Sequence, residues 1–492
     1  MARARIHHGH QVNLADLLLD TPEWASPDDV LVHAGDRTVT RAELTELAVG
    51  VRDRVRDAGV EPGMPVAMMG ENTPETIATL FGVWAAGAVY VPVNPRTTPD
   101  ERARLFESVP PALVLETAGG ATDPPRSPDR EVKTYDGDVA LVQMTSGTTG
   151  PPKPVLLTHA AVLSLIDAVL EKVRGSKLTK KSSTVNLLPV SLSLWAGIYN
   201  TVFAFRVGAP VVLMEKFEPR EFASLVDKHG IRSVVLPPAA IAMLCDDDEL
   251  TSLAPLEWVR SITAPLSPFL ARRFHQRFGI GVLNSYGQTE LGGEIVGWNA
   301  ADWREWSDMK LGAVGRPHAG VEVRTLRDDG SLADGDDTGE LVVRTPSLSA
   351  GYADGSALNV DRATVEGWFR TGDLGRVDAD GFVWIDGRVS DQINRGGMKV
   401  TPSEVEEVLV AAPGVREAAV VAASDERLGE IPVAFVVPVD PSAVPDAAAL
   451  EEHCRAHLSP WKVPVRFHAL DTLPRNEVGK VLKRELAEPD RA

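Results

Sequence analysis

Residues 139–153 read Val-Ala-Leu-Val-Gln-Met-Thr-Ser-Gly-Thr-Thr-Gly-Pro-Pro-Lys, an apolar run followed by a loop rich in glycine and hydroxyl side chains. Directly after a strand, such a loop presents backbone N–H groups and short hydroxyls that suit phosphate oxygens, and Lys153 adds a positive charge. The spacing of Gly147, Gly150 and Lys153 differs from that of the P-loop of nucleotide triphosphatases. On its own, the stretch fits either a phosphate-binding loop or a flexible surface loop.

Short apolar runs alternate with helical segments on both sides of this stretch. Apolar runs start at Val66, Ser233 and Gly281, and helical periodicity follows the first two from about Pro74 and Ala239. This alternation is typical of parallel sheets that are covered by helices. We therefore expect an α/β fold in this part of the chain.

The pattern changes in the last third of the chain. From about Gly320, strands separated by Asp-Gly turns predict an antiparallel β unit. A further unit begins near Asp391, in which Ser403 and Glu406 have the spacing of a capping box. Its expected order is helix, strand, strand, helix, over residues 403–411, 417–422, 433–437 and 446–457. We expect a large N-terminal domain of packed α/β subdomains plus the β unit over 1–390, and a small α+β domain over 391–492.

Composition excludes several classes of function. The 492 residues include 50 Lys and Arg against 69 Asp and Glu, a net charge of −19, so neither nucleic acid nor an anionic membrane surface is a general partner. The two cysteines have no zinc-ligand spacing and indicate a reducing compartment. The longest apolar run, 77–93, is too short for a membrane helix, and no secretory signal is visible. We expect a cytoplasmic protein without integral membrane association.

A second motif, Asn284-Ser-Tyr-Gly-Gln-Thr-Glu290, follows the apolar run 281–283. A carboxylate beside hydroxyl and amide groups at the carboxyl end of a strand suits Mg²⁺, which takes few protein ligands when phosphates are present. Glu290 is the candidate ligand. The alternative is an ordinary turn between a strand and a loop.

Three more charged positions are ambiguous when taken singly. Asp373 in Thr-Gly-Asp and Arg388 in Asp-Gly-Arg suit ribose hydroxyls, but Asp-Gly is equally a plain turn. Lys480 follows a glycine in a basic segment near the C-terminus, where it either neutralises charge in a transition state or belongs to a solvated tail.

The joint order of these motifs resolves the ambiguity. In this order and spacing the chain resembles the ANL superfamily of adenylate-forming enzymes, which includes acyl-CoA synthetases, adenylation domains of nonribosomal peptide synthetases and beetle luciferases. The resemblance extends from Thr40-Arg-Ala-Glu-Leu through 86–95 to Gly479-Lys480. It implies an N-terminal adenylation body and a mobile C-terminal domain that rotates between two half-reactions, with Ser390 at the hinge.

The resemblance also implies roles for single residues. Lys480 bridges the attacking oxyanion and the α-phosphate, Thr289 contacts the α-phosphate, and Glu290 binds Mg²⁺. The expected ATP site comprises Thr145, Ser146, Gly147, Thr148, Thr149, Gly150, Lys153, Thr263, Ala264, Pro265, Asn284, Ser285, Tyr286, Gly287, Asp373 and Arg388. In the second state Gly396, Gly397 and Lys399 face the thiol acceptor.

The expected acid pocket departs from the family pattern. Leu192, within two residues in either direction, stands where relatives commonly carry a histidine, and Ile262 replaces a glycine and narrows the pocket. The other expected pocket residues are Trp195, Gly292 and Gly293.

These features predict ATP-dependent activation of a small, medium-chain or aromatic carboxylic acid as acyl-AMP, followed by thioester formation with CoA. Two alternatives stay open. One is a free-standing enzyme that loads a carrier protein. The other is activation of nitrite, which diazotises an aromatic amine.

Overall fold

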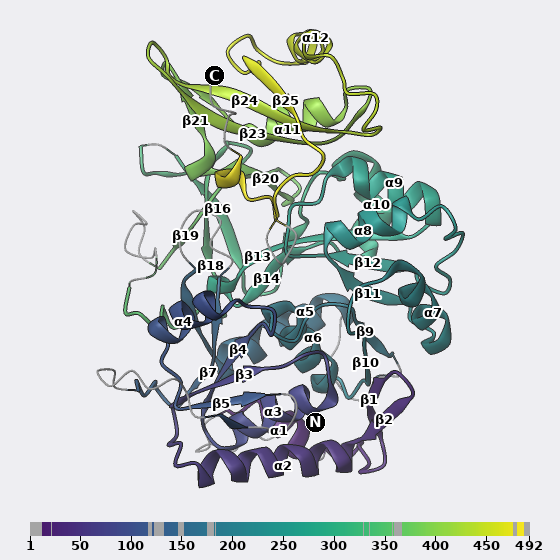
Figure 1. Ribbon diagram of the computed structural model, residues 1–492, viewed down its shortest axis with the longest axis vertical. Helices are drawn as coiled ribbons and strands as arrows, with labels where there is room; N and C mark the ends of the chain where they lie inside the picture. The colour runs from purple at the N-terminus through teal and green to yellow at the C-terminus, as the bar shows by residue number, and fades with distance from the viewer. Residues whose placement is uncertain are drawn as a thin grey trace.

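The chain forms a large body and a smaller C-terminal body, which lie at opposite ends of the long axis (Figure 1). The computed structural model describes residues 12–20, 22–116, 121–122, 132–145, 152–174, 182, 184–327, 329–333, 335–356, 358, 367–475 and 480–486. Within these ranges no helix has both the length and the apolar character that crossing a membrane requires.

Two sheets build the N-terminal part of the large body. In the first, four parallel strands are flanked by antiparallel edge strands, in the order β6-β5-β3-β4-β7-β8. Its strands are β3 (Pro65–Met69), β4 (Val89–Val93), β5 (Leu113–Glu116), β6 (Ala121–Thr122), β7 (Val139–Met144) and β8 (Pro154–Thr158). The second consists of β1 (Val30–Ala34), β2 (Arg37–Thr40), β9 (Asn186–Leu188) and β10 (Val211–Leu213).

Helices cover these sheets, as the alternation predicts. They are α1 (Asp16–Leu19), α2 (Arg41–Asp57), α3 (Pro74–Ala85), α4 (Pro99–Ser108), α5 (His159–Arg174) and α6 (Trp195–Arg206). Thr73 caps α3, Pro74 follows as its first residue, and Gly87 has the positive φ of 78° that turns the chain into β4.

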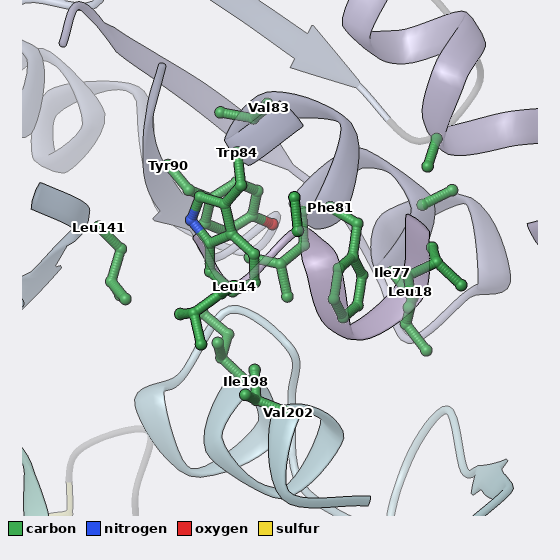
Figure 2. Close-up of a cluster of buried hydrophobic side chains, with 14 of the residues drawn as sticks. Leu14, Leu18, Ile77, Phe81, Val83, Trp84, Tyr90, Leu141, Ile198 and Val202 are labelled. Atoms are coloured by element: carbon green, nitrogen blue, oxygen red, sulfur yellow. The ribbon is translucent and has the colours of Figure 1, made fainter. Parts of the chain in front are cut away.

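The main hydrophobic core lies where α3 meets α1 and α6 (Figure 2). Phe81 and Trp84 of α3 are fully buried, and Phe81 stacks on Phe205 of α6 at 5.2 Å between ring centroids. The Trp84 indole N–H donates to the Ala140 carbonyl at 2.7 Å, so the one polar atom of that ring is satisfied. Each such side chain contributes about 1.5–3 kcal/mol by burial, so this core stabilises the large body.

A third sheet, in the order β11-β12-β13-β14-β15, carries one side of the cleft described below. Its strands are β11 (Ser233–Leu236), β12 (Trp258–Ser261), β13 (Gly281–Gln288), β14 (Gly293–Gly297) and β15 (Arg316–Pro317), and its helices are α7 (Pro219–His229), α8 (Pro238–Asp246), α9 (Pro268–Phe278) and α10 (Ala300–Lys310). The expectation that the strand ends before Asn284 is wrong. β13 continues to Gln288 because residues 285–288 pair antiparallel with β14.

The predicted antiparallel unit is a sheet in the order β17-β16-β18-β19-β20. Its strands are β16 (Glu322–Leu326), β17 (Leu332–Ala333), β18 (Gly339–Arg344), β19 (Phe369–Val377) and β20 (Val383–Arg388). A short 3₁₀ helix, η3 (Val389–Asp391), connects β20 to the C-terminal body.

The C-terminal body packs two helices on one sheet. It contains β21 (Ile393–Arg395), β22 (Met398–Val400), α11 (Pro402–Val410), β23 (Val415–Asp425), β24 (Gly429–Pro438), α12 (Ala447–His457), β25 (Arg466–Ala469) and the 3₁₀ helix η4 (Lys483–Glu485). The predicted capping box is wrong, because α11 begins one residue earlier. The Ser403 hydroxyl donates to the Asp386 carbonyl of β20, and the Glu406 carboxylate accepts from the Val420 N–H.

Candidate active site

A cleft with a volume of about 3190 Å³ lies between the large body and the C-terminal body. This volume exceeds the roughly 300–1,000 Å³ of a site for one small ligand, so the cleft has room for a nucleotide and a second substrate. Most of the residues that the sequence singles out line it: Thr145, Lys153, Trp195, Ile262, Thr263, Ala264, Pro265, Asn284, Ser285, Tyr286, Gly287, Thr289, Glu290, Gly293, Asp373, Arg388, Ser390 and Lys480.

Several expected residues do not line the cleft. Leu192 itself is 2% exposed and packs into the main core, while its N–H donates to the Asn72 side chain. Ser193 and Leu194, which lie within two residues of it, line the cleft instead. Gly292 ends the 3₁₀ helix η1 (Thr289–Leu291) with a φ of 82° and presents its carbonyl to the Trp195 indole N–H at 2.8 Å. Gly396 and Gly397 on the β21–β22 turn and Lys399 of β22 are exposed and do not line the cleft. Ser146, Gly147, Thr148, Thr149 and Gly150 lie outside the described residues.

Asp373 is the centre of a hydrogen-bond network on the wall of the cleft. Its Oδ2 accepts from the Tyr286 hydroxyl at 2.6 Å and from Gln288 Nε2 at 2.7 Å. Its Oδ1 pairs with Arg388 Nε at 2.8 Å, and the Asp373 side chain is only 6% exposed. A carboxylate has about four lone-pair sites, so three bonds hold it in place and leave it able to accept from a ligand hydroxyl.

The strand register brings this network together. Asp373 lies directly opposite Arg388 in the antiparallel β19–β20 pair. The Thr371 hydroxyl accepts from the Asp373 N–H at 3.0 Å, which fixes the turn that presents the carboxylate. Burial and the adjacent Asp373 charge raise the pKa of Tyr286 well above its usual value, so Tyr286 stays a donor to Asp373.

Glu290 lies on η1, opposite Tyr352. The Tyr352 hydroxyl donates to Glu290 Oε1 at 3.1 Å, and the Lys153 ammonium lies 5.0 Å from the centre of the Tyr352 ring. Thr145 and Lys153 are joined by two hydrogen bonds: the Thr145 N–H donates to the Lys153 carbonyl at 2.9 Å, and the Lys153 N–H donates to the Thr145 hydroxyl at 3.0 Å. Tyr352 therefore contacts both Lys153 and the Glu290 carboxylate.

Lys480 of the C-terminal body lies half-buried in the cleft. Burial and the Arg388 guanidinium lower the pKa of Lys480, while Asp373 and Glu290 oppose that shift. All three of these groups belong to the large body. In this domain arrangement Lys480 therefore shares one electrostatic environment with the Asp373 network and with Glu290.

Thr263 has strained backbone geometry at the edge of the cleft. Its φ of 71° is the one positive value for a non-glycine residue in the described part of the chain, and its buried hydroxyl has no partner among the described residues. Positive φ is costly for a β-branched residue and marks functional sites more often than ordinary loops. The strained backbone and the unpartnered hydroxyl make Thr263 a candidate binding position.

Sequence reasoning missed several residues of the cleft. Gln288 was inside a quoted motif, and its amide holds Asp373. Arg260 of β12 and Glu294 of β14 form an ion pair with Nη1 and Oε1 2.6 Å apart, and both line the cleft. Tyr199 of α6 lines it beside Trp195, with ring centroids 5.9 Å apart. Gln288, by its place in that motif, and Arg260, two positions before Ile262, had a signal in the sequence, whereas Glu294 and Tyr199 had none.

The chain matches the AMP-binding enzyme family over residues 23–353 and the AMP-binding enzyme C-terminal domain over residues 404–480. It is 33% identical to a sulfoacetate–CoA ligase of Cupriavidus necator, over 87% of this chain and 88% of that protein. It is 30% identical to a fatty acid–[acyl-carrier-protein] ligase of Streptomyces coeruleorubidus, over 98% of this chain and 97% of that protein.

Among solved structures it resembles the o-succinylbenzoate CoA synthetase of Bacillus subtilis. The complex of that protein with its acyl-adenylate intermediate superposes with a TM-score of 0.83 at 25% identity, over 97% of this chain and 98% of that one. The complex of that protein with ATP and a magnesium ion gives a TM-score of 0.81 at 25% identity, over 96% of this chain and 99% of that one. The chain therefore belongs to the AMP-binding enzyme family, within the ANL superfamily of adenylate-forming enzymes, and is an AMP-forming ligase.

Proposed function

We propose that this ligase converts a carboxylic acid and ATP to an acyl-AMP and then transfers the acyl group to CoA. The observation that carries the proposal is the position of Lys480, inside the cleft and in the field of Asp373, Arg388 and Glu290. A cation at this position stabilises the negative charge that accumulates when a carboxylate approaches a phosphate. The relatives whose names specify CoA ligases support the choice of acceptor.

In the first step a carboxylate oxygen of the acid attacks the α-phosphorus of ATP. A bond forms between the carboxylate oxygen and the α-phosphorus. The bond from the α-phosphorus to the oxygen that bridges to the β-phosphate breaks, and pyrophosphate leaves. We assign Lys480 to the incoming oxyanion and Thr289 to the α-phosphate, because these groups approach the cleft from the two bodies. Their contribution is positioning and charge stabilisation, so no nucleophilic side chain is needed.

The nucleoside fits the Asp373 network. Asp373 and Arg388 offer an acceptor and a donor to ribose hydroxyls, and Tyr286 and Gln288 hold the carboxylate in the required orientation. We place the adenine against Thr263–Pro265, where the unpartnered Thr263 hydroxyl is available to it. This placement also accounts for the strained φ of Thr263, since the strain positions a binding segment.

Glu290 fits a magnesium ion that is held mainly by phosphates. The described residues contain no group of three or more His, Cys, Asp or Glu side chains arranged around a metal, so a site made by protein alone is absent from them. One carboxylate with phosphate oxygens and water is the usual donor set for Mg²⁺. When bound, the ion neutralises phosphate charge, and Tyr352 keeps Glu290 in place with its hydrogen bond.

In the second step the thiol sulfur of CoA attacks the acyl carbon. A carbon–sulfur bond forms, the carbon–oxygen bond to AMP breaks, and the thiol proton leaves. The β21–β22 turn with Gly396, Gly397 and Lys399 does not line the cleft in this arrangement. We therefore propose that the C-terminal body rotates about Ser390 in η3, where the Ser390 hydroxyl bonds Asp391 at 2.9 Å.

A carrier protein is the second candidate for the acceptor, and the similarity to an acyl-carrier-protein ligase favours it specifically. AMP release should be measured for a panel of acids with CoA, with a phosphopantetheinylated carrier protein and with neither, together with the mass of the product. Acyl-CoA as product supports the proposal. An acylated carrier protein with no acyl-CoA selects the second candidate. AMP release that requires nitrite and an aryl amine instead of an acid overturns both.

A further inference from the structure

A buried cluster of charges forms part of the inner wall of the cleft. Arg260 and Glu294 are paired at 2.6 Å, with side chains 16% and 9% exposed. His318 Nε2 lies 3.0 Å from the same Glu294 oxygen and is 1% exposed. Lys172 of α5 donates to the carbonyls of Gly297 and Arg316, each at 2.6 Å.

This cluster carries one more positive charge than negative charge. Asp302 is matched by Arg316 at 2.7 Å, which leaves Lys172 and Arg260 against the single carboxylate of Glu294. His318 does not change the balance, because burial lowers its pKa more than Glu294 raises it. Burial opposes the ionisation of Glu294, but Arg260 and His318 outweigh it and hold its pKa at about 2. An uncompensated charge in a buried site favours a bound counter-ion.

A hydrogen-bond donor without an acceptor lies beside the same pair. The Tyr199 hydroxyl is buried and has no partner among the described residues, and it lies within electrostatic range of Glu294 and Arg260. Buried hydroxyls are almost always bonded, so an unpaired one in the wall of a cleft points to a ligand oxygen. A guanidinium carries five N–H donors, more than the two bonds of Arg260 to Glu294 and the Trp298 carbonyl use.

The pair lies close to Ile262, which the resemblance assigns to the acid pocket. Ile262 follows β12 directly, and side chains two residues apart on a strand share a face, so Arg260 lies about 7 Å along the strand from Ile262. Gly297 allows the pair to approach the backbone, because a Cβ there would lie 2.5 Å from Glu294 Oε1 and 2.9 Å from Arg260 Nη1. This part of the cleft wall therefore accommodates buried charges and does not form an apolar surface for an acyl chain.

We propose that the acid activated by this chain is short and carries a second anionic group, which binds the Arg260 guanidinium and the Tyr199 hydroxyl. The inference rests on the proposed function, since it assigns the far end of the acid whose reacting carboxylate meets Lys480. It specifies a substrate class: small dianionic acids rather than fatty or purely apolar aromatic acids.

Matched pairs of acids test this directly. Pyrophosphate release should be followed with succinate against butyrate and with adipate against hexanoate. We expect kcat/KM to be at least about tenfold higher for the dianionic member of a pair, the value of one charge-assisted hydrogen bond. A preference for the monoacid in both pairs overturns the inference and leaves the proposed function intact. Failure of every acid to release pyrophosphate overturns the proposed function itself.

Variants then locate the second binding point. Tyr199→Phe removes only an unpaired hydroxyl, so it should fold normally and reduce the selectivity ratio about tenfold. Arg260→Gln combined with Glu294→Gln removes both charges together, which avoids an unpaired buried carboxylate, and should bring the ratio close to one. Tyr135→Phe, at a buried tyrosine that does not line the cleft, is the control and should leave the ratio unchanged. An unaltered ratio in folded Tyr199→Phe, shown by its thermal unfolding, rejects the assignment.

Discussion

Asp373 Oδ1 and Arg388 Nε lie 2.8 Å apart across the β19–β20 pair, as directly opposed residues of that register. Tyr286 and Gln288 hold the other carboxylate oxygen from β13. Side chains from two sheets, β13 of the third sheet and β20 of the antiparallel sheet, therefore converge on the Asp373 carboxylate. The proposed nucleotide site therefore depends on a few placed hydrogen-bonding groups rather than on many cations.

Asp373→Asn should raise the KM for ATP about ten- to a hundredfold, because the amide replaces the charge-assisted bonds of the carboxylate and presents a donor to Arg388. The KM for the acid should change little. Steady-state kinetics with each substrate varied in turn measures the two effects. Asp378→Asn is the matched control, since Asp378 pairs with Lys310 outside the cleft, and a similar rise there would contradict the assignment.

Lys480→Ala should reduce adenylate formation at least about a hundredfold while ATP binding is nearly retained, because the lysine acts on charge that develops during the attack. Pyrophosphate release and equilibrium ATP binding separate the two quantities. Lys462→Ala, which removes an exposed ion pair with Glu404 in the same body, should leave both unchanged. Full adenylation activity in Lys480→Ala would exclude the mechanism proposed above.

The pH dependence of adenylation should show an alkaline limb below the usual range for a lysine. Lys480 must be protonated to act, and since burial and Arg388 lower its pKa, activity falls as pH rises through that lowered value. A profile of kcat/KM against pH measures this alkaline limb. In Lys480→Arg, whose side chain stays charged, any residual activity should lack it, and a limb of unchanged position would assign the titration to another group.

Tyr352→Phe should raise the Mg²⁺ concentration needed for half-maximal activity several-fold. The variant loses the 3.1 Å hydrogen bond to Glu290 but keeps the ring beneath Lys153. Tyr352→Leu removes both and should also raise the KM for ATP. Magnesium titrations at saturating ATP distinguish the two variants. The same Mg²⁺ requirement and the same KM for ATP in Tyr352→Phe and Tyr352→Leu would show that the hydroxyl has no separate role.

His159 should make folding stability sensitive to acid. It is 4% exposed, its Nδ1 accepts from the Leu14 N–H at 3.1 Å, and burial lowers its pKa to about 4. The unfolded chain protonates near pH 6.5, so stability is retained above that value and is lost as pH falls toward 4, by about 3 kcal/mol in total.

His159→Asn keeps an acceptor for Leu14 without this titration. Its free energy of unfolding, from denaturant melts at several pH values, should therefore fall less between pH 6.5 and pH 4 than that of the wild type. His457→Asn, at an exposed histidine of α12, serves as the control. Parallel pH profiles for wild type and His159→Asn would show that other groups cause the acid loss.

Local patterns were sufficient to predict the fold class and several of the elements. The alternation of apolar runs and helical segments predicted β3 with α3 and β11 with α8, since periodicity reports burial directly. Strands separated by Asp-Gly turns predicted the antiparallel sheet. Predictions failed where a distant partner determined the outcome. β13 extends through Gln288 because β14 pairs with it, and Ser403 bonds Asp386 of the other body rather than its own helix.

The sequence by itself determined the family, the order of the ATP-related motifs and the presence of Lys480 and Glu290, because these signals are local and their spacing is distinctive. Only the tertiary structure brought Arg260, Glu294 and Tyr199 together from β12, β14 and α6 and placed the additional charge of Lys172 beside them. Burial and pairing of charges depend on contacts between distant segments, and no pattern along the chain encodes them. Our proposal for the far end of the acid rests on these contacts.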